Sequence, residues 1–321
     1  MAAGKRRVEG LAFALRDPYP WADLATLARV GESIGYRALF LPEVGSRDVL
    51  ASLTGLAGEA RSLLLASGVV PLPARSSRLL AKAAATVQES SDGRLILGVG
   101  TGPAVPGALD RVRAMVAMLR AAFEGGEATT PEGETFRLGL VPSAPPPIWI
   151  AALGPRAVRL AGEIADGVLL NWCTPERVAE AVAEVREGAA TSGRDPDQVT
   201  VAVYIRACIH GDDANAELEA VQTAAGEYAG YGAYFRQFER MGLGEAAGRA
   251  AAAHASARPA DVPGSFVRAV AVVGDPTAAR SRLEEYRDAG AHLPVVYPAL
   301  VPGITPARSA LGTLEALAPK G

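Results

Sequence analysis

The segment at residues 148–175 constrains the fold of this chain more than any other. It reads IWIAALGPRAVRLAGEIADGVLLNWCTP, in which an apolar run, a Leu-Gly-Pro turn, an amphipathic helix and a second apolar run follow one another. Pro155 suits the first helical position because its missing N–H group costs nothing there. A strand, a tight turn, a helix and another strand form a βαβ unit, which predicts a parallel sheet.

The turn in this segment is a candidate anion site. It lies at the carboxyl end of a strand and opens a helix, where free N–H groups and the positive end of the helix dipole converge. A phosphate is the anion we expect there, although an ordinary turn that binds nothing is the alternative. The candidate residues are Ala152, Leu153, Gly154, Pro155 and Arg156.

The rest of the chain alternates between the same two kinds of segment. We expect strands at 8–15, 38–41, 63–66, 94–99, 148–152, 167–170, 199–207 and 293–297, and helices at 21–34, 49–60, 77–90, 106–123, 155–165, 175–190 and from 275 onward. Residues 262–273 read as a short helix, and residues 125–147 read as a surface excursion with a hairpin edge at 134–136.

This alternation predicts a single domain over residues 1–321 with an α/β fold, a (β/α)₈ TIM barrel whose active-site loops lie at the carboxyl ends of the strands. A doubly wound sheet is the alternative, but no Gly-x-Gly-x-x-Gly follows the first strand. The alanine-rich, helical stretch at about 212–257 is too long for a plain connection, so we interpret it as an insertion that forms a lid or a dimer contact.

Composition excludes several classes of partner. The 32 Lys and Arg residues nearly balance the 35 Asp and Glu residues, which gives no electrostatic case for nucleic acid or an anionic membrane surface. No apolar run reaches the roughly 20 residues of a membrane span. Two cysteines supply no disulfide framework and the histidines lack metal-ligand spacing, so we expect no metal site. Charges at residues 16–17 cut off the first apolar run, which makes a poor signal peptide and favours the cytoplasm.

Short motifs along the chain carry a resemblance to a known family. They are GYRALFLPE at 35–43, SGVVP at 67–71 with Arg75, GRLILGVG at 93–100, IAALGP at 150–155, ADGV at 165–168 leading into Asn171 and Trp172, and VGDP at 273–276. In their order and spacing the chain resembles the luciferase-like monooxygenase superfamily. The branch it most resembles contains coenzyme F420-dependent oxidoreductases similar to methylene-tetrahydromethanopterin reductase. Only residues 125–145 and the insertion lie outside the resemblance.

The resemblance implies a cofactor at the carboxyl face of the barrel, either the deazaflavin F420 or, as the alternative, FMN. It implies that the turn at 152–156 approaches the cofactor phosphate, and that a bulge at Gly68 and Val69 backs the ring through a non-prolyl cis peptide. Gly98 and Gly100 would leave room for the cofactor, with close packing inside the barrel as the alternative. Trp172 would pack against the cofactor or fill the barrel.

Glu43 is the candidate catalytic residue. It matches the acidic residue at the end of the second strand, but Val44 stands where many relatives carry a histidine. Glu43 would take over proton handling, since a carboxylic acid desolvated by a flat apolar ring suits a general acid near neutral pH. The alternative is a structural carboxylate that pairs with Arg47 or Arg75, in a network that Asp48 would complete.

Three functions remain open from the sequence. The first is an enzyme that transfers a hydride between F420 and a small organic substrate, because a deazaflavin carries hydride and does not activate oxygen as a flavin does. The second is an FMN-dependent monooxygenase. The third is a non-catalytic homologue that has lost its cofactor, which the missing histidine motivates. For either enzyme we expect a homodimer and a separate reductase that supplies the reduced flavin or F420.

Overall fold

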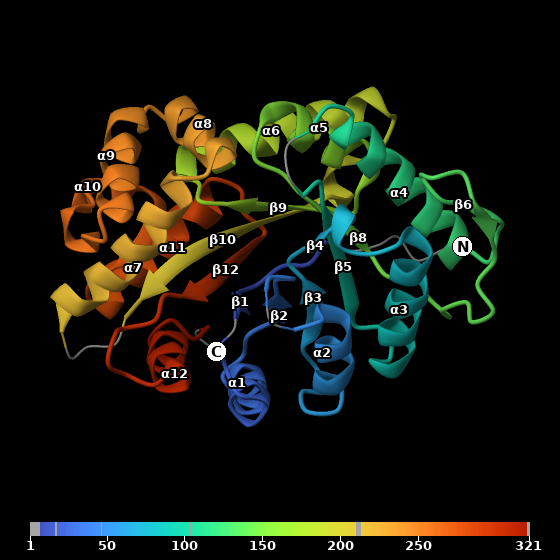
Figure 1. The fold of residues 1–321 in the computed structure, drawn as a ribbon. Helices are drawn as coiled ribbons and strands as arrows, with labels where there is room; N and C mark the ends of the chain where they lie inside the picture. Colours follow the sequence, from blue (N-terminus) through green and yellow to red (C-terminus); the bar gives the residue numbers. More distant parts are fainter. Residues whose placement is uncertain (1–6, 17, 46, 103–104, 210–212, 320–321) are drawn as a thin grey trace.

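The computed structural model describes residues 7–16, 18–45, 47–102, 105–209 and 213–319. Eight parallel strands close into a barrel (Figure 1), because β1 pairs with β12 at one seam and β9 pairs with β10 at the other. The predicted (β/α)₈ TIM barrel is therefore confirmed. Its strands are β1 (Ala12–Ala14), β2 (Ala38–Leu41), β3 (Leu64–Ser67), β5 (Leu95–Gly100), β8 (Ile148–Ala151), β9 (Gly167–Asn171), β10 (Thr200–Cys208) and β12 (Leu293–Pro298).

Helices surround this barrel on the outside (Figure 1). Several begin at polar caps, as at α3, where the Ser76 hydroxyl accepts a hydrogen bond from the Leu79 N–H group. The helices are α1 (Trp21–Ser33), α2 (Val49–Leu56), α3 (Ser77–Ser90), α4 (Ala108–Phe123), α5 (Pro155–Ile164), α6 (Pro175–Thr191), α11 (Pro276–Asp288) and α12 (Pro306–Ala316), with 3₁₀ turns at Leu72–Ala74, Pro196–Gln198 and Pro259–Asp261.

Sequence reasoning missed α12, the helix that follows the eighth strand. The signal was present, because Pro306 stands at the first helical position and Ala310 and Leu314 are apolar at helical spacing. Both side chains are buried, and the Tyr36 hydroxyl donates a hydrogen bond of 3.0 Å to the Leu314 carbonyl. The helix is therefore part of the barrel wall.

The segment between β10 and β12 differs from the expectation in one element. The insertion is helical, as expected, and contains α7 (Ala214–Ala229), α8 (Gly232–Arg240) and α9 (Gly244–Ala255). Its expected start at residue 212 lies outside the described residues. Residues 262–273 are not one helix. They form α10 (Gly264–Val270) and then β11 (Ala271–Val273), which pairs in parallel with the last residues of β10.

Two short additions complete the secondary structure. The surface excursion after α4 contains an antiparallel pair, β6 (Ala128–Thr129) and β7 (Thr135–Phe136), which confirms the expected hairpin edge. The two-residue strand β4 (Val70–Pro71) continues beyond β3 and pairs with the end of β5. No helix among the described residues is long and apolar enough to cross a bilayer.

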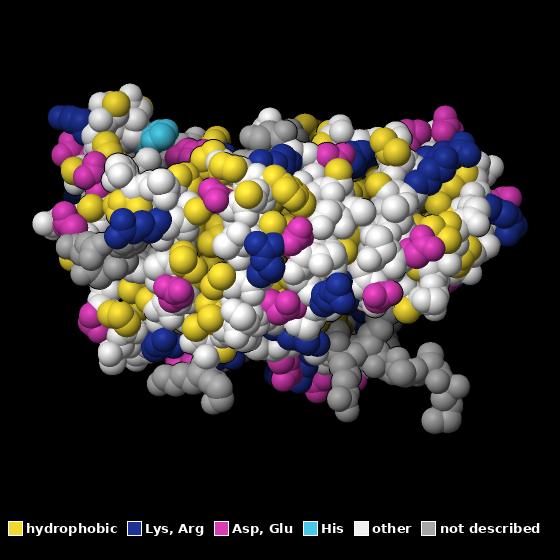
Figure 2. Space-filling model, turned by 90° about the horizontal axis from the view of Figure 1, so that it is seen from below, with side chains coloured by type: hydrophobic (Ala, Val, Ile, Leu, Met, Phe, Trp, Pro, Cys, Tyr) yellow, Lys and Arg dark blue, Asp and Glu magenta, His cyan; other side chains and the backbone are white. Residues whose placement is uncertain are grey.

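The core has three parts. Inward-facing side chains such as Phe40, Trp149 and Tyr204 fill the barrel interior, and a larger shell packs between the strands and the outer helices. A third cluster joins the insertion helices to α10 and β11, with Val221, Phe238 and others buried against one another. The face around α12, α1 and α2 carries hydrophobic side chains interspersed with charges of both signs (Figure 2).

Candidate active site

A cavity of about 650 Å³ opens at the carboxyl ends of the barrel strands. Every barrel strand contributes to its wall, at or just after the strand's carboxyl end, as in Arg16, Glu43, Gly68, Gly100, Ala151, Asn171, Arg206 and Tyr297. The insertion adds Tyr228, Ala233 and Tyr234. This is the location that the barrel topology predicts for an active site, and the volume lies within the usual range for small-molecule pockets.

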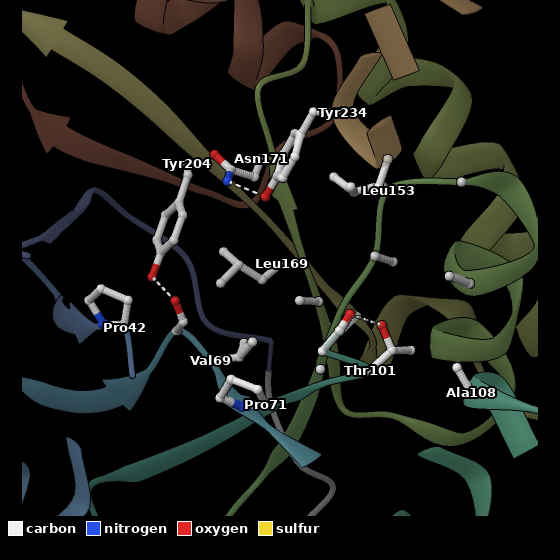
Figure 3. Close-up of a pocket in the computed structure, with 18 of the residues that line it drawn as sticks. Pro42, Val69, Pro71, Thr101, Ala108, Leu153, Leu169, Asn171, Tyr204 and Tyr234 are labelled. Carbon is white, nitrogen blue, oxygen red and sulfur yellow. Dashed lines mark hydrogen bonds between the residues drawn. The ribbon is translucent and has the colours of Figure 1, made fainter. Parts of the chain in front are cut away.

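The bulge after β3 has the geometry implied by the resemblance. The peptide bond between Gly68 and Val69 is cis, and both residues line the cavity. The Tyr204 hydroxyl donates a hydrogen bond of 3.0 Å to the Gly68 carbonyl (Figure 3), which fixes the bulge from across the barrel. A Cβ atom on Gly68 would lie 1.8 Å from that hydroxyl oxygen, so a larger residue at this position would force Tyr204 to move.

The two glycines of β5 are placed differently from each other. Gly100 lines the cavity, whereas Gly98 does not. A Cβ atom on Gly98 would lie 2.1 Å from the Ser67 carbonyl oxygen, and one on Gly100 would lie 2.8 Å from a methyl group of Val69. Both glycines therefore pack closely against the β3 bulge. Gly98 lies outside the cavity wall, whereas contact of Gly100 with the cofactor stays a prediction.

The turn at 152–156 opens α5 without a side-chain cap. Ala152, Leu153, Gly154 and Arg156 line the cavity, and Pro155 stands beside them at the first helical position. The N–H groups of residues 154 and 156 donate to no acceptor in the part of the chain that the structure describes. Uncapped N–H groups at a helix start that faces a cavity are a suitable anion site.

A second element brings positive charge to this turn. An Nη atom of Arg240, from α8, lies 3.8 Å from the position a Cβ atom would take on Gly154. The pKa of Arg240 is lowered mainly by burial and, to a smaller extent, by the positive charge of Arg177. Within the described residues Arg240 forms no salt bridge, whereas Arg177 pairs with Glu184 at 2.7 Å. Arg240 is therefore a cation beside the turn without a salt-bridge partner among the described carboxylates, which favours an anion there.

Glu43 lies in the cavity wall, but it is paired. Two N–H groups of Arg75 donate to its two carboxylate oxygens, and a third reaches Asp48 at 2.9 Å. The Arg75 guanidinium holds the pKa of the Asp48 carboxyl below its ordinary value. The structural pairing that the sequence left as an alternative is therefore present, with Arg75 and Asp48, while Arg47 donates to the Tyr19 carbonyl. The catalytic role of Glu43 stays a prediction.

Trp172 lies behind the cavity wall. It is fully buried and packs on Tyr228, in the cluster that joins the insertion to the barrel. Its backbone is left-handed, with φ 54°, which is unfavourable for a bulky residue. Gln237 of α8 stabilises this conformation by donating to the carbonyls of Asn171 at 2.7 Å and Trp172 at 2.9 Å. Trp172 thus supports the wall from outside.

Sequence reasoning missed Arg206, which projects from β10 into the cavity. Its side chain is buried, and its guanidinium carbon lies 3.7 Å from the centre of the Tyr297 ring and 5.0 Å from that of Trp172. Burial raises the pKa of Tyr297 to about 12, so its hydroxyl is neutral at physiological pH. The signal that could have found Arg206 is a lone charge in an otherwise apolar strand, two residues after Tyr204 and therefore on the same face.

The two cysteines are as expected. Cys173 and Cys208 are both free and buried, and burial raises the pKa of each thiol to about 12. A thiol in this environment stays protonated and is a poor nucleophile. Cys173 therefore belongs to the supporting structure around Trp172 and not to the reactive groups of the cavity.

Comparison with known proteins agrees with this geometry. The family model for luciferase-like monooxygenases matches residues 8–293. The chain is 31% identical to the 5,10-methylenetetrahydromethanopterin reductase of Methanolobus tindarius over 301 residues, which cover 88% of this chain and 91% of the relative.

Two solved structures share the fold. The coenzyme F420-dependent tetrahydromethanopterin reductase from Methanopyrus kandleri superposes with a TM-score of 0.77 at 23% identity, over 95% of this chain and 97% of that chain. An F420-dependent secondary alcohol dehydrogenase in complex with an F420-acetone adduct also has a TM-score of 0.77, at 17% identity, over 97% and 99% of the two chains.

Proposed function

The chain belongs to the luciferase-like monooxygenase family, and on that premise we propose that it is an oxidoreductase that transfers a hydride between coenzyme F420 and a small organic substrate. The observation that carries the proposal is that one cavity contains both the uncapped start of α5, with arginines beside it, and the apolar wall at the bulge after β3. The names of its relatives and structural neighbours support the choice of F420.

The residues present fit a cofactor that has both a flat ring and a phosphate. Val69, Pro71 and Leu169 supply apolar wall to the cavity (Figure 3), and the cis bulge is held in place by Tyr204. The turn at 152–156 supplies N–H donors for an anion, with Arg240 nearby. When bound, the deazaflavin supplies the hydride chemistry, and the protein orients it and excludes water.

Glu43 is the residue of this chain that we propose to handle a proton. It lines the cavity, and Arg75 fixes its position through a two-point contact. Arg75 in turn is held by Asp48, which caps α2 by accepting from the Ala51 N–H group at 2.9 Å. The carboxylate is therefore pre-positioned at the mouth of the barrel.

The decisive experiment is a titration of the full chain with F420 and, separately, with FMN, followed by fluorescence and by the melting temperature. We expect F420 to bind more tightly, and saturation at about 100 times its Kd to stabilise the protein by about 2.7 kcal/mol. Tighter binding of FMN would instead support the second candidate, an FMN-dependent monooxygenase, which the description of the family favours. Binding of neither would favour the non-catalytic homologue.

A homodimer and a separate supplier of reduced cofactor complete the proposal. The insertion is no longer an argument for the dimer, because its apolar residues do not need a partner chain: they pack within this chain against α10 and β11. Light scattering tests the dimer directly, and a mass that stays near 33.1 kDa at all concentrations would contradict it.

A further inference from the structure

Arg206 is the starting point of a separate inference about the substrate. Arg206 is 5% exposed, and its guanidinium is surrounded by the rings of Trp172, Tyr204, Tyr228 and Tyr297, with the farthest ring centre at 5.9 Å. Stacked rings hold a cation in place and offset part of the cost of its burial. They do not neutralise its charge.

The hydrogen bonds of Arg206 leave most of its donors unused. One Nη group donates to the Asn171 side-chain oxygen at 3.2 Å, and the other reaches the Tyr228 hydroxyl at 3.4 Å. A guanidinium has five N–H donors in a planar fork. Both acceptors found within the described residues are neutral, so the fork can still bind an anion.

The charges around the cavity show that Arg206 differs from its neighbours. Glu43 is paired with Arg75, and Arg16 lies 4.0 Å from Glu227. Arg156 lines the cavity but is exposed to solvent. Arg206, in contrast, forms no salt bridge with any carboxylate of the described ranges, although it is deeply buried.

We propose that Arg206 binds a carboxylate group of the organic substrate, so that the substrate of this enzyme is a carboxylic acid. The proposal rests on the proposed function, to which it adds the class of substrate. One guanidinium with one positive charge matches a monoanion, and its planar fork matches the two oxygens of a carboxylate. The aromatic walls suit an apolar body on the same molecule.

The neighbouring polar groups help to orient such a substrate. Asn171 accepts from Arg206 through its oxygen and donates through its nitrogen to the Tyr234 hydroxyl at 2.9 Å (Figure 3). The Tyr234 hydroxyl, which accepts this hydrogen bond, keeps its own proton to donate, and it also lines the cavity. An anion at Arg206 would therefore find a neutral donor beside the charge.

The test uses three probes on the full chain, namely benzoate, its uncharged isostere benzamide and inorganic phosphate. Affinities are measured by titration calorimetry, with and without the cofactor that binds. We expect benzoate to bind on the order of 10- to 100-fold more tightly than benzamide, as a charge-assisted, two-point contact predicts. Equal affinities of benzoate and benzamide in the unmodified protein would overturn the proposal. Phosphate binding that is stronger than benzoate binding and is weakened by Arg206→Met would also overturn it, because phosphate bound at the turn at 152–156 should not depend on Arg206.

Two variants then assign the effect to Arg206. Arg206→Met should abolish the preference for benzoate. Arg206→Lys, which keeps the positive charge, should weaken benzoate binding several-fold because an ammonium cannot form the planar fork. Arg78→Met is the matched control, since Arg78 also stacks on a ring, at 5.7 Å from Phe136, away from the cavity. A folded Arg206 variant with unchanged benzoate affinity would overturn the assignment.

The same titrations separate this proposal from the proposed function. If neither F420 nor FMN binds but the benzoate preference depends on Arg206, the function fails and the carboxylate site stands. If a cofactor binds and the protein does not prefer benzoate to benzamide, the carboxylate site fails and the proposed function stands. If Arg206→Met weakens the cofactor and leaves benzoate unchanged, Arg206 belongs to the cofactor site and the proposal is overturned.

Discussion

Gly154→Asp should make the protein more stable while it destroys the cofactor site. Gly154 is the residue that caps α5, with φ −91° and ψ 159°, a backbone conformation that any residue can adopt. A Cβ atom there would meet no atom closer than Arg240 at 3.8 Å. An aspartate can therefore be accommodated, and its carboxylate would cap the helix at the place where we propose that the phosphate binds.

The two effects have opposite signs and can be estimated separately. A carboxylate at a helix start adds about 0.3–1 kcal/mol from the dipole, and replacing glycine at a compatible position adds about 0.4–1 kcal/mol through the unfolded chain. The sum, about 0.7–2 kcal/mol, corresponds to a melting temperature higher by about 1–3 °C for a chain of 321 residues. Two negative charges about 4 Å apart repel by about 4 kcal/mol at an effective dielectric constant near 20, so affinity should fall on the order of 100-fold or more.

The assay is a cofactor titration followed by a thermal melt on the same preparations. Gly154→Ala is the matched control, because it adds the Cβ atom without the charge, and it should keep affinity within a few-fold of the unmodified protein. A stable Gly154→Asp variant that binds cofactor with unchanged affinity would refute the assignment of the phosphate to this turn. A variant that loses stability would refute the estimate of the space at this position.

Three further predictions concern other parts of the site and the barrel. Glu43→Gln should lower turnover by about 10²–10⁴-fold, whereas Asp48→Asn, which removes the other carboxylate from Arg75 and lies outside the cavity wall, should lower turnover much less; an equal effect of the two variants would make Glu43 structural. Gly68→Ala should cost about 1–3 kcal/mol in urea unfolding through its clash with Tyr204, and adding Tyr204→Phe should recover part of that loss. The pKa of His292 is lowered by burial and, to a smaller extent, by the charge of Arg7. The melting temperature should therefore fall as the pH drops below about 6.5, because the unfolded chain binds a proton there that the native state does not bind. His292→Asn should remove this part of the dependence of the melting temperature on pH.

The barrel could be predicted from the sequence because its evidence is local. Helix α3 occupies the expected residues, with Ser76 as its cap, and β2 matches residue for residue. The exceptions have local causes too. Residues 271–273 are apolar and follow a helical pattern directly, so only their pairing with β10 shows that they form a strand.

The site could be predicted only in part, because its contacts are not local. The turn at 152–156 carries its own signal in Gly154 and Pro155, and the structure places it in the cavity wall. The sequence around Gly98 does not distinguish a cofactor contact from close packing. Only the structure shows that a Cβ atom there would collide with the Ser67 carbonyl oxygen, which favours close packing. The partner of Glu43 was open for the same reason, since 32 residues separate it from Arg75.

The insertion explains why the barrel motifs alone do not describe the site. Its helices supply Tyr228 and Tyr234 to the cavity, and Arg240 stands beside the turn that opens α5. Gln237, between Tyr234 and Arg240 on α8, donates to the backbone at the end of β9. One short helix therefore joins the aromatic end of the cavity to its anion-binding end. A change in the packing of α8 should alter both ends together, which makes the insertion a structural part of the site and not an addition to it.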